Sequence, residues 1–354
     1  MTGNRHRTFP IHVSNLEIGG NNPIIIQSMT NTRTHELENT LAQINELYNA
    51  GCQVVRVAVP DKQAIQTLPL LVAKSPVPLV ADIHFNYQLA IDAIKSGVSK
   101  IRINPGNIGS VDKVSDIVSV AKEFKVPIRI GINSGSLEKS LLDKYGGPTH
   151  MALVESAVNN VMMLSKMNFH NVIVSIKASD VMTTIRANQE FAKRLSNPLH
   201  LGITEAGTIK QGTIKSAAGI GSLLAQGIGD TIRVSLSGSP VDEVEVAKTL
   251  LSSLGLSKGV EIISCPTCGR TDIDVEQLAL EVEKLLSNYQ VPIKVAVMGC
   301  AVNGPGEAKE ADLGVAGAKD YGVLFKKGKI VKKVPRDELM DILMTEIEQA
   351  AQLK

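Results

Sequence analysis

The sequence is poor in several residue types that mark whole classes of protein. Tryptophan is absent and aromatic residues make up 3% of the 354 residues, so platforms for stacking nucleic-acid bases are scarce. Lysine and arginine (37) nearly balance aspartate and glutamate (35), which gives a net charge of +2 and no general attraction to nucleic acid or membrane. We therefore expect neither kind of partner.

Long apolar runs are also lacking. No stretch of about 18 apolar residues occurs, and residues 1–8 do not resemble the apolar core of a secretory signal. The chain has four cysteines, three of them clustered, unlike a secreted protein held together by disulfides. These absences predict a cytoplasmic protein without a membrane span.

What the sequence does contain is an alternation of short β-branched segments with longer segments of helical periodicity. Eight strands are predicted, at residues 23–29, 53–59, 78–84, 100–104, 126–133, 171–177, 199–205 and 230–236. Eight βα units over about 230 residues predict a (β/α)8 TIM barrel. A doubly wound open sheet is the alternative, but it more often has fewer units and a glycine-rich phosphate loop after its first strand, which is lacking here.

The pattern changes after residue 254. Residues 255–258 resemble a linker, and a smaller set of elements follows. Strands are predicted near 260–263, 293–297, 313–316, 322–325 and 329–333, and helices at 274–286 and 336–352. We expect two domains, a TIM barrel over residues 1–254 and a small α+β domain over residues 255–354.

Polar and apolar residues alternate along the predicted barrel strands. In the second strand, for example, Val55 and Val57 share one face while Arg56 lies on the other. Because the apolar face should pack on the helices, the polar face should point into the barrel, mostly near the C-terminal strand ends where barrel active sites lie. The predicted inward set is Asp82, His84, Arg102, Asn104, Arg129, Asn133, Lys177, Glu205, Arg233 and Ser235, with Arg33 in the loop after the first strand.

Cations dominate this inward set. Four cations lie on the fourth, fifth, sixth and eighth strands, namely Arg102, Arg129, Lys177 and Arg233. Together with Arg33 and Arg56 they outnumber the inward carboxylates Asp82 and Glu205. A buried salt-bridge network is the structural alternative for any one arginine, but an uncompensated buried charge is costly, so an anionic ligand should balance the excess. Arginine forks match phosphate oxygens, and the sequence therefore predicts a small phosphorylated or diphosphorylated substrate.

Two residues are candidate acid–base groups. Glu205 lies at a strand end among cations that would keep it ionised or use it to move a proton. For His84 a structural and a catalytic role both stay open. Cys52, just before the second strand, is predicted to be a packed, inert thiol.

The remaining cysteines form two motifs, Cys265-Pro-Thr-Cys268 and, 31 residues later, Gly299-Cys300-Ala-Val-Asn303-Gly-Pro-Gly-Glu307. A structural zinc site would need a fourth cysteine or histidine, which Cys300 does not have nearby. An iron–sulfur cubane needs one ligand per iron, and Glu307 is the nearest oxygen ligand. A surface role for Glu307 and a structural zinc module without redox function stay open.

Taken together, these motifs resemble those of one family. They are residues 27–33, 81–85, 102–109, 177–180, 200–207 and 229–235, followed by the two cysteine motifs. Over nearly its whole length the chain is similar to bacterial 4-hydroxy-3-methylbut-2-enyl diphosphate synthases of the methylerythritol phosphate route to isoprenoids.

The resemblance implies a [4Fe-4S] cluster bound by Cys265, Cys268, Cys300 and Glu307. It implies two-electron reduction of 2-C-methyl-erythritol 2,4-cyclodiphosphate, with flavodoxin or ferredoxin as electron donor. The residues implied to bind the substrate are Arg33, Arg102, Arg129, Asn133, Lys177, Arg233 and Ser235. Glu205 would protonate the departing hydroxyl, and Asn303 would lie near the same oxygen.

Chain direction adds one expectation about assembly. The eighth helix of a TIM barrel returns the chain to the rim opposite the active site, and only a short linker follows it here. The cysteine domain should therefore cap the barrel of a second copy. We expect a head-to-tail homodimer, which the family resemblance also implies.

Overall fold

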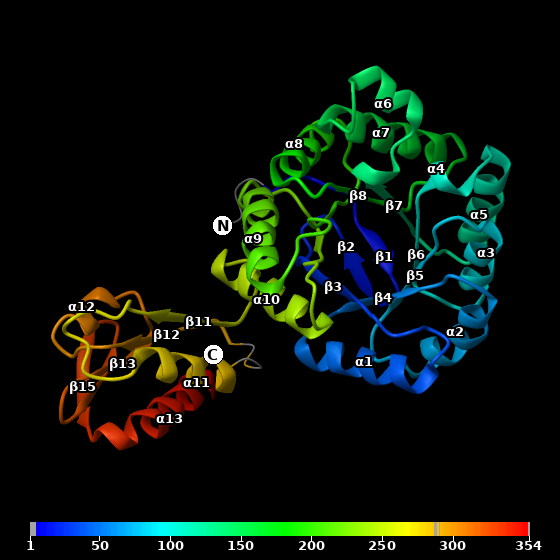
Figure 1. The fold of residues 1–354 in the computed structure, drawn as a ribbon. Coiled ribbons are helices and arrows are strands. Elements are labelled where there is room, and N and C mark those ends of the chain that lie inside the picture. Colours follow the sequence, from blue (N-terminus) through cyan, green and yellow to red (C-terminus); the bar gives the residue numbers. More distant parts are fainter. Residues whose placement is uncertain (1–4, 287–288, 290, 353–354) are drawn as a thin grey trace. The chain divides into compact units, whose positions relative to one another are not determined.

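The protein is described by a computed structural model, which covers residues 5–286, 289 and 291–352. It consists of two compact units that divide between Leu254 and Gly255 (Figure 1). The first is a barrel of parallel strands surrounded by helices, and the second is a five-stranded sheet with helices. The predicted fold class, a TIM barrel followed by a small domain of strands and helices, is confirmed.

The barrel contains all eight predicted strands. They are β3 (Ile25–Met29), β4 (Val54–Ala58), β5 (Leu79–Asp82), β6 (Lys100–Ile103), β7 (Ile128–Asn133), β8 (Val172–Lys177), β9 (His200–Leu201) and β10 (Thr231–Ile232). Neighbouring strands pair in parallel in the order β8-β7-β6-β5-β4-β3-β10-β9, and a bridge between Val174 and Leu199 closes the ring. The last two strands are shorter than predicted, because the chain leaves the sheet after two residues and forms loops at the barrel mouth.

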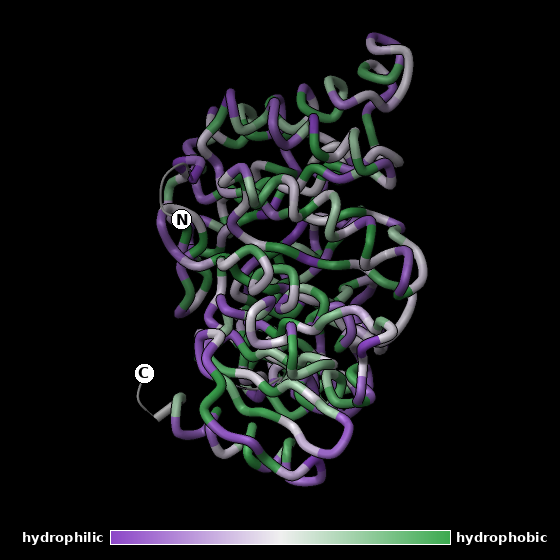
Figure 2. The backbone as a smooth tube through the Cα atoms, turned by 90° about the vertical axis from the view of Figure 1, so that its left-hand side faces the viewer, coloured by the Kyte–Doolittle hydropathy of each residue, from purple (hydrophilic) through white to green (hydrophobic). Residues whose placement is uncertain are grey.

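Helices cover the outside of the barrel. The principal ones are α1 (Leu37–Ala50), α2 (Lys62–Lys74), α3 (Tyr87–Lys95), α5 (Val111–Glu123), α7 (His150–Lys166), α8 (Val181–Ala192), α9 (Ile209–Ala225) and α10 (Pro240–Ser253). The short α4 (Pro105–Ile108), η1 (Ser134–Ser136) and α6 (Lys139–Tyr145) lie in loops that follow β6 and β7. Side chains of Asp61, Thr149 and Asp180 accept backbone N–H bonds at three helix starts, which fixes where those helices begin. Hydrophobic and hydrophilic residues alternate along the helices in Figure 2, as packing on a sheet requires.

An antiparallel hairpin that the sequence analysis did not predict precedes the barrel. Its strands are β1 (Ile11–Val13) and β2 (Leu16–Ile18). Ile11, Val13 and Ile18 are buried in one cluster with apolar residues of β3, β4, β5 and β8. Strands of three residues are too short to show a period-two pattern, which explains the omission. The hairpin gives the barrel interior an apolar layer at the N-terminal ends of its strands.

The C-terminal unit is a mixed sheet. Its strands are β11 (Val260–Ser264), β12 (Ile293–Met298), β13 (Leu313–Gly317), β14 (Gly322–Lys326) and β15 (Lys329–Val334), in that spatial order. The first three are parallel and the last two antiparallel to their neighbours. Its helices are α11 (Val275–Leu286), α12 (Gly304–Glu307), η2 (Arg336–Glu338) and α13 (Leu339–Gln352).

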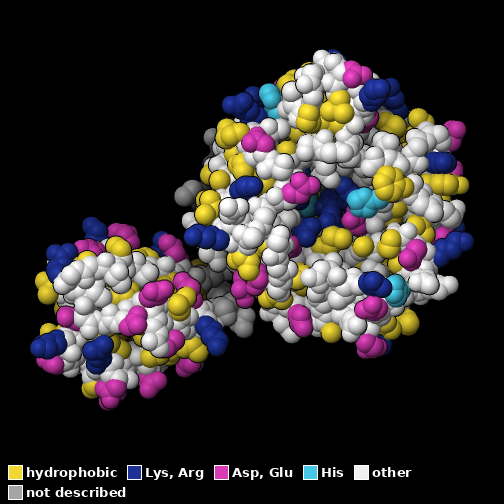
Figure 3. All heavy atoms as spheres, viewed as in Figure 1, with side chains coloured by type: hydrophobic (Ala, Val, Ile, Leu, Met, Phe, Trp, Pro, Cys, Tyr) yellow, Lys and Arg dark blue, Asp and Glu magenta, His cyan; other side chains and the backbone are white. Residues whose placement is uncertain are grey.

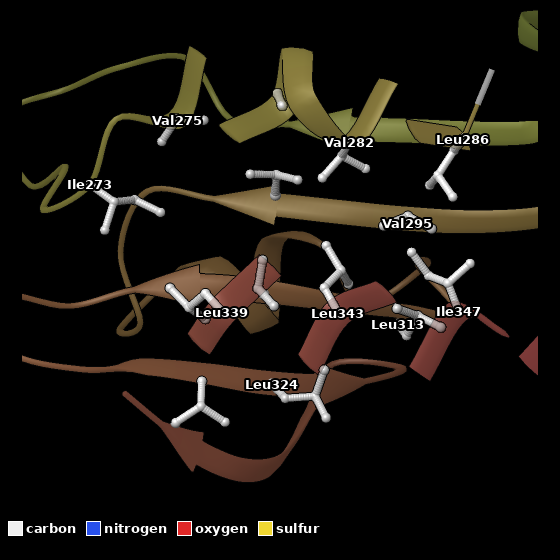
Figure 4. Packing of buried hydrophobic residues seen from close by; sticks show 14 of the residues in the cluster. Ile273, Val275, Val282, Leu286, Val295, Leu313, Leu324, Leu339, Leu343 and Ile347 are labelled. Carbon is white, nitrogen blue, oxygen red and sulfur yellow. The ribbon is translucent and has the colours of Figure 1, made fainter. Parts of the chain in front are cut away.

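Each face of this sheet has its own apolar core. On one face, α11 and α13 contribute Val282, Leu343 and Ile347 to a cluster with Val295 and Leu313 (Figure 4). On the other face, a cluster of mostly small side chains, including Ala308 and Ala311, lies beneath the segment that contains α12. Within the described residues, no helix is long and apolar enough to cross a membrane.

The β1–β2 hairpin at the base of the barrel leads to a prediction about stability. Ile18→Ala is expected to lower the free energy of unfolding by about 2–4 kcal/mol, because it leaves a cavity in the apolar layer at the base of the barrel. Urea denaturation measures the change. Ile214→Ala, which removes the same atoms from an exposed position on α9, should stay within about 0.5 kcal/mol of the parent. Equal effects of the two substitutions would contradict the assigned role of the hairpin.

Candidate active site

A cavity opens at the C-terminal ends of the barrel strands. Its volume is about 150 Å³. Figure 3 shows lysine and arginine side chains at the floor of a hollow in this unit. The cavity is lined by Arg56, Asp82, His84, Arg102, Arg129, Gly131, Asn133, Ser175, Lys177, Thr204, Arg233 and Ser235.

Asp82 is the central carboxylate of this cavity. Its oxygens lie 3.1 Å from Arg102 Nη1, 3.8 Å from Arg56 Nε and 3.3 Å from His84 Nε2. Burial acts to raise the pKa of Asp82, but Arg56, the His84 hydrogen bond and Arg102 together hold that pKa well below its ordinary value. Asp82 therefore stays ionised and balances part of the positive charge.

A second carboxylate, Glu243 on α10, forms an ion pair with Arg233. It accepts hydrogen bonds from Arg233 Nε at 3.3 Å and Nη2 at 3.2 Å, and also from the Ser28 hydroxyl and the Leu236 N–H. This two-point contact orients the guanidinium at the cavity wall. The sequence analysis missed Glu243, because its direction depends on how α10 packs on β3.

Two other cations have no such partner. Arg129 and Lys177 are buried, and neither makes an ion pair with a carboxylate of the described chain. Arg129 Nε and Nη1 have no hydrogen-bond acceptor. Burial, reinforced by neighbouring arginines, lowers the pKa of both side chains well below their ordinary values. The cavity thus holds positive charge that the described residues do not neutralise, and an anion would do so.

Glycines make room for these cations. A β-carbon at Gly131 would lie 2.5 Å from Arg102 Nε, and one at Gly202 would collide with Lys177 Nζ. A larger residue at either position would force the charged group that it meets to shift. The two glycines therefore help to set where the cationic groups lie.

A polar layer lies deeper in the barrel. Lys100 is fully buried and donates to Gln27 Oε1 at 3.4 Å. His200 shares a 2.6 Å hydrogen bond with the Thr231 hydroxyl, and burial lowers the pKa of His200 well below its ordinary value, so its ring is neutral. Lys100 lies two residues before Arg102, so the strand alternation could have predicted it.

The structure brings most of the predicted substrate-binding residues together. Arg102, Arg129, Asn133, Lys177, Arg233 and Ser235 all line the cavity. Arg33 and Glu205 are exposed and do not line it. The prediction that Glu205 points into the barrel is wrong, because its side chain is exposed; the second carboxylate that pairs with a cavity cation is Glu243 on α10. Glu205 has a φ of 53°, a backbone conformation that is uncommon for residues other than glycine.

Asn104 also differs from its prediction. Its side chain accepts the Gly106 N–H at the start of α4 and donates to the Ser136 hydroxyl. It therefore caps a helix and ties two mouth loops together, and it does not line the cavity. Cys52 is buried, and burial raises the pKa of its thiol to about 12, which makes it inert as predicted.

In the C-terminal unit, the two cysteine motifs meet at one edge of the sheet. Ser264 at the end of β11 pairs with Val297 in the parallel strand β12, so Cys265 and Cys300 both follow neighbouring strand ends. The Gly299 N–H donates to Cys265 Sγ at 3.1 Å. The Asp272 N–H donates to the Gly299 carbonyl at 2.9 Å and joins the loops a second time.

Cys268 is exposed on the same loop. The backbone N–H of Arg270 and the Thr271 hydroxyl lower the pKa of its thiol, which favours the thiolate that binds soft metals. Glu307, at the end of α12, is exposed, and Asn303 precedes that helix. Among the described residues, no three His, Cys, Asp or Glu side chains are grouped closely enough to hold a metal ion. The predicted ligand set thus lies in adjacent loops without forming a closed site.

These features define a class of protein, a TIM barrel with a cationic cavity at its mouth, joined to a unit with three cysteines at the ends of neighbouring strands. Solved structures support the barrel. The 3-dehydroquinate dehydratase of Geobacillus kaustophilus has a TM-score of 0.52 at 16% identity, over 71% of this chain and 98% of that one. The dihydropteroate synthase of Yersinia pestis has a TM-score of 0.50 at 12% identity, over 71% and 99%. At these identities the likeness concerns the fold alone.

Sequence comparison then defines the family. A model described as the GcpE TIM-barrel domain matches residues 8–248, and one described as the GcpE protein C-terminal domain matches residues 261–349. The chain belongs to the GcpE family.

Two relatives carry the name 4-hydroxy-3-methylbut-2-en-1-yl diphosphate synthase (flavodoxin). The protein from Natranaerobius thermophilus is 65% identical over 98% of this chain and 97% of its own length. The protein from Bacillus licheniformis is 55% identical over 98% and 94%. The similarity therefore extends over both units.

The unpaired cations lead to a prediction for the ligand-free protein. Lys177→Met should raise the thermal midpoint of the barrel by a few degrees, because it removes a desolvated ammonium from among arginines. The same substitution should abolish the stabilisation that pyrophosphate gives the parent protein. Calorimetry with and without pyrophosphate measures both effects.

A matched control is Lys166→Met, which changes an exposed lysine at the end of α7. It should leave the midpoint and the pyrophosphate response unchanged. Destabilisation of the ligand-free Lys177→Met protein, with the pyrophosphate response retained, would contradict the assignment of Lys177 as an uncompensated, anion-binding cation.

Proposed function

We propose that this member of the GcpE family opens and reduces 2-C-methyl-erythritol 2,4-cyclodiphosphate to 4-hydroxy-3-methylbut-2-enyl diphosphate. The observation that carries the proposal is that two buried cations in the barrel cavity, Arg129 and Lys177, form no ion pair with a described residue. A diphosphate group supplies the negative charge that these residues lack. The names of the close relatives support the same product.

The reaction balances with two electrons and two protons. The bond between C2 and its phosphate oxygen breaks, the C3 hydroxyl leaves as water, and a C2–C3 double bond forms. The names of both relatives include flavodoxin, which is the proposed electron donor. The opened diphosphate remains attached at C4 throughout.

The cavity residues would bind and orient the substrate. Of the residues that line the cavity, Arg102, Arg129, Lys177 and Arg233 would face the diphosphate oxygens, and Asn133 and Ser235 would add neutral hydrogen bonds. The fixed guanidinium of Arg233 needs little reorganisation, because Glu243 already holds it. Arg33 is exposed, and its proposed contact requires its loop to close over the substrate.

The cysteine edge would hold a [4Fe-4S] cluster, with Cys265, Cys268, Cys300 and Glu307 as ligands. Three thiols from two joined loops suit such a cluster, and so does the N–H that donates to Cys265 Sγ. When bound, the cluster would pass single electrons to the substrate. Glu307 is a weaker ligand for iron than a thiolate, which suits an exchangeable position. Accordingly, residues 1–254 form the proposed substrate domain and residues 255–354 the proposed cluster domain.

Glu205 would donate the proton that lets the C3 hydroxyl leave, and Asn303 would contact the same oxygen. The left-handed backbone at Glu205 supports a functional role, because such strain persists where the surrounding loop maintains it. Both side chains would reach the substrate only in a closed state that excludes water.

The proposed assembly is a head-to-tail homodimer in which each cluster domain caps the barrel of its partner. The direction of α10 supports it. The start of α10 is tied to the mouth through Glu243 and Arg233, while Lys248 reaches Gly51, which precedes β4 at the other rim. The linker at residues 254–259 would act as the hinge. The cytoplasmic location predicted from the sequence stays a prediction.

Metal analysis tests the cluster. The anaerobically purified protein should contain about four irons and four sulfides per chain, whereas a structural zinc module would contain one zinc.

Cys268→Ser should lose the cluster, because it removes an exposed thiolate ligand, while Cys52→Ser, at the inert thiol, should retain it. Glu307→Ala should keep much of the iron yet lose turnover. Full iron content in Cys268→Ser would contradict the ligand assignment.

The proton-transfer role has a separate test. Glu205→Gln should lower kcat about 100-fold or more, because the amide cannot supply a proton. The KM for the cyclodiphosphate should change little, since Glu205 does not line the cavity. Steady-state assays measure both constants. If Glu205→Gln kept full activity, the proposed proton donor would be wrong.

A further inference from the structure

The hairpin of β14 and β15 carries an unusual concentration of positive charge. Lysines occupy five of the eight positions from 326 to 333, and no carboxylate interrupts them. Elsewhere in the C-terminal unit, carboxylates outnumber lysines and arginines. Lys326 pairs with Glu346, whereas Lys327, Lys329 and Lys332 make no ion pair with a described residue. The hairpin is therefore a local cationic surface on an otherwise acidic unit.

The same hairpin exposes apolar side chains. Residues 329–333 of β15 are all exposed, although the adjacent strand β14 is buried over residues 322–325. Ile330 is 55% and Val331 56% exposed. Lysines on an edge strand can simply prevent pairing with another sheet. Ile330 and Val331, which are exposed and β-branched, would instead favour such pairing. Exposed apolar residues within a polar rim are typical of an interaction site.

The hairpin is also connected to the cysteine loops. A β-carbon at Gly328, in its turn, would lie 3.1 Å from the Pro305 carbonyl of α12, the helix that contains Glu307. Ile330 pairs with Phe325, which packs in the same apolar cluster as Met298 and Cys265. The sheet register places Lys333 in line with Val323, Ala316 and Met298. Three strand spacings, roughly 14 Å, therefore separate Lys333 from the end of β12 that precedes Cys300. A donor docked at this end of β15 would lie near the cysteines without covering their loops.

We propose that this hairpin surface, formed by Lys327, Lys329, Ile330, Val331, Lys332 and Lys333, docks a small acidic electron-carrier protein. The inference rests on the proposed function, because a carrier is needed only if the cysteines hold a redox centre. Lysines steer an acidic partner into place, and the two apolar residues bind it after encounter. The cysteine loops and Glu307 stay open towards the substrate.

Turnover with two reductants tests the surface. Lys329, Lys332 and Lys333 are changed together to glutamine in the full-length protein. The KM for reduced flavodoxin should rise about tenfold and lose much of its dependence on salt, because the steering charges are gone. Turnover with reduced methyl viologen, which needs no docking surface, should equal that of the parent. A matched control changes Lys62, Lys95 and Lys166, three exposed lysines on barrel helices, and should leave both assays unchanged.

The results separate the possible failures. An unchanged KM for flavodoxin in the hairpin variant would overturn the proposal, and so would an equal rise in the control. If the hairpin variant instead dissociated into monomers in sedimentation, the surface would be a contact between copies, which also overturns it. A parent protein that forms no product with methyl viologen would refute the proposed function itself, independently of the docking surface.

Discussion

The constraint on which the site depends is the excess of buried positive charge inside the barrel. Arg129 and Lys177 are buried, and no carboxylate of the part of the chain that the structure describes forms an ion pair with either. Such a placement is costly in the free protein and becomes favourable when an anion enters. The proposed diphosphate ligand would therefore offset a cost in stability that the barrel itself carries.

Other features of the barrel limit that cost. Asp82 and Glu243 neutralise some of the cations and fix their directions, and the histidine in the deeper layer is neutral. Glycines at 131 and 202 leave space for long cationic side chains. The β1–β2 hairpin supplies an apolar layer at the other end of the barrel. Polar chemistry at the mouth is therefore supported by apolar packing at the base.

The sequence predicted those parts that follow from local periodicity. β-branched segments with a period of two identified all eight barrel strands, and their alternation placed Arg102, Arg129 and Lys177 in the interior. The same rule could have found Lys100 and Ser175. It could not find Glu243, whose direction is set by packing between a helix and a strand. The exposed position of Glu205 likewise depends on tertiary structure. So does the meeting of the cysteine loops, because it follows from the order of strands in the sheet, which makes β11 and β12 neighbours.

The most direct measurement is an anaerobic crystal structure with 2-C-methyl-erythritol 2,4-cyclodiphosphate bound. The diphosphate oxygens should lie within hydrogen-bond distance of Arg129 and Lys177 in the barrel cavity. A substrate bound elsewhere, with both cations still unpaired, would contradict the proposed origin of binding.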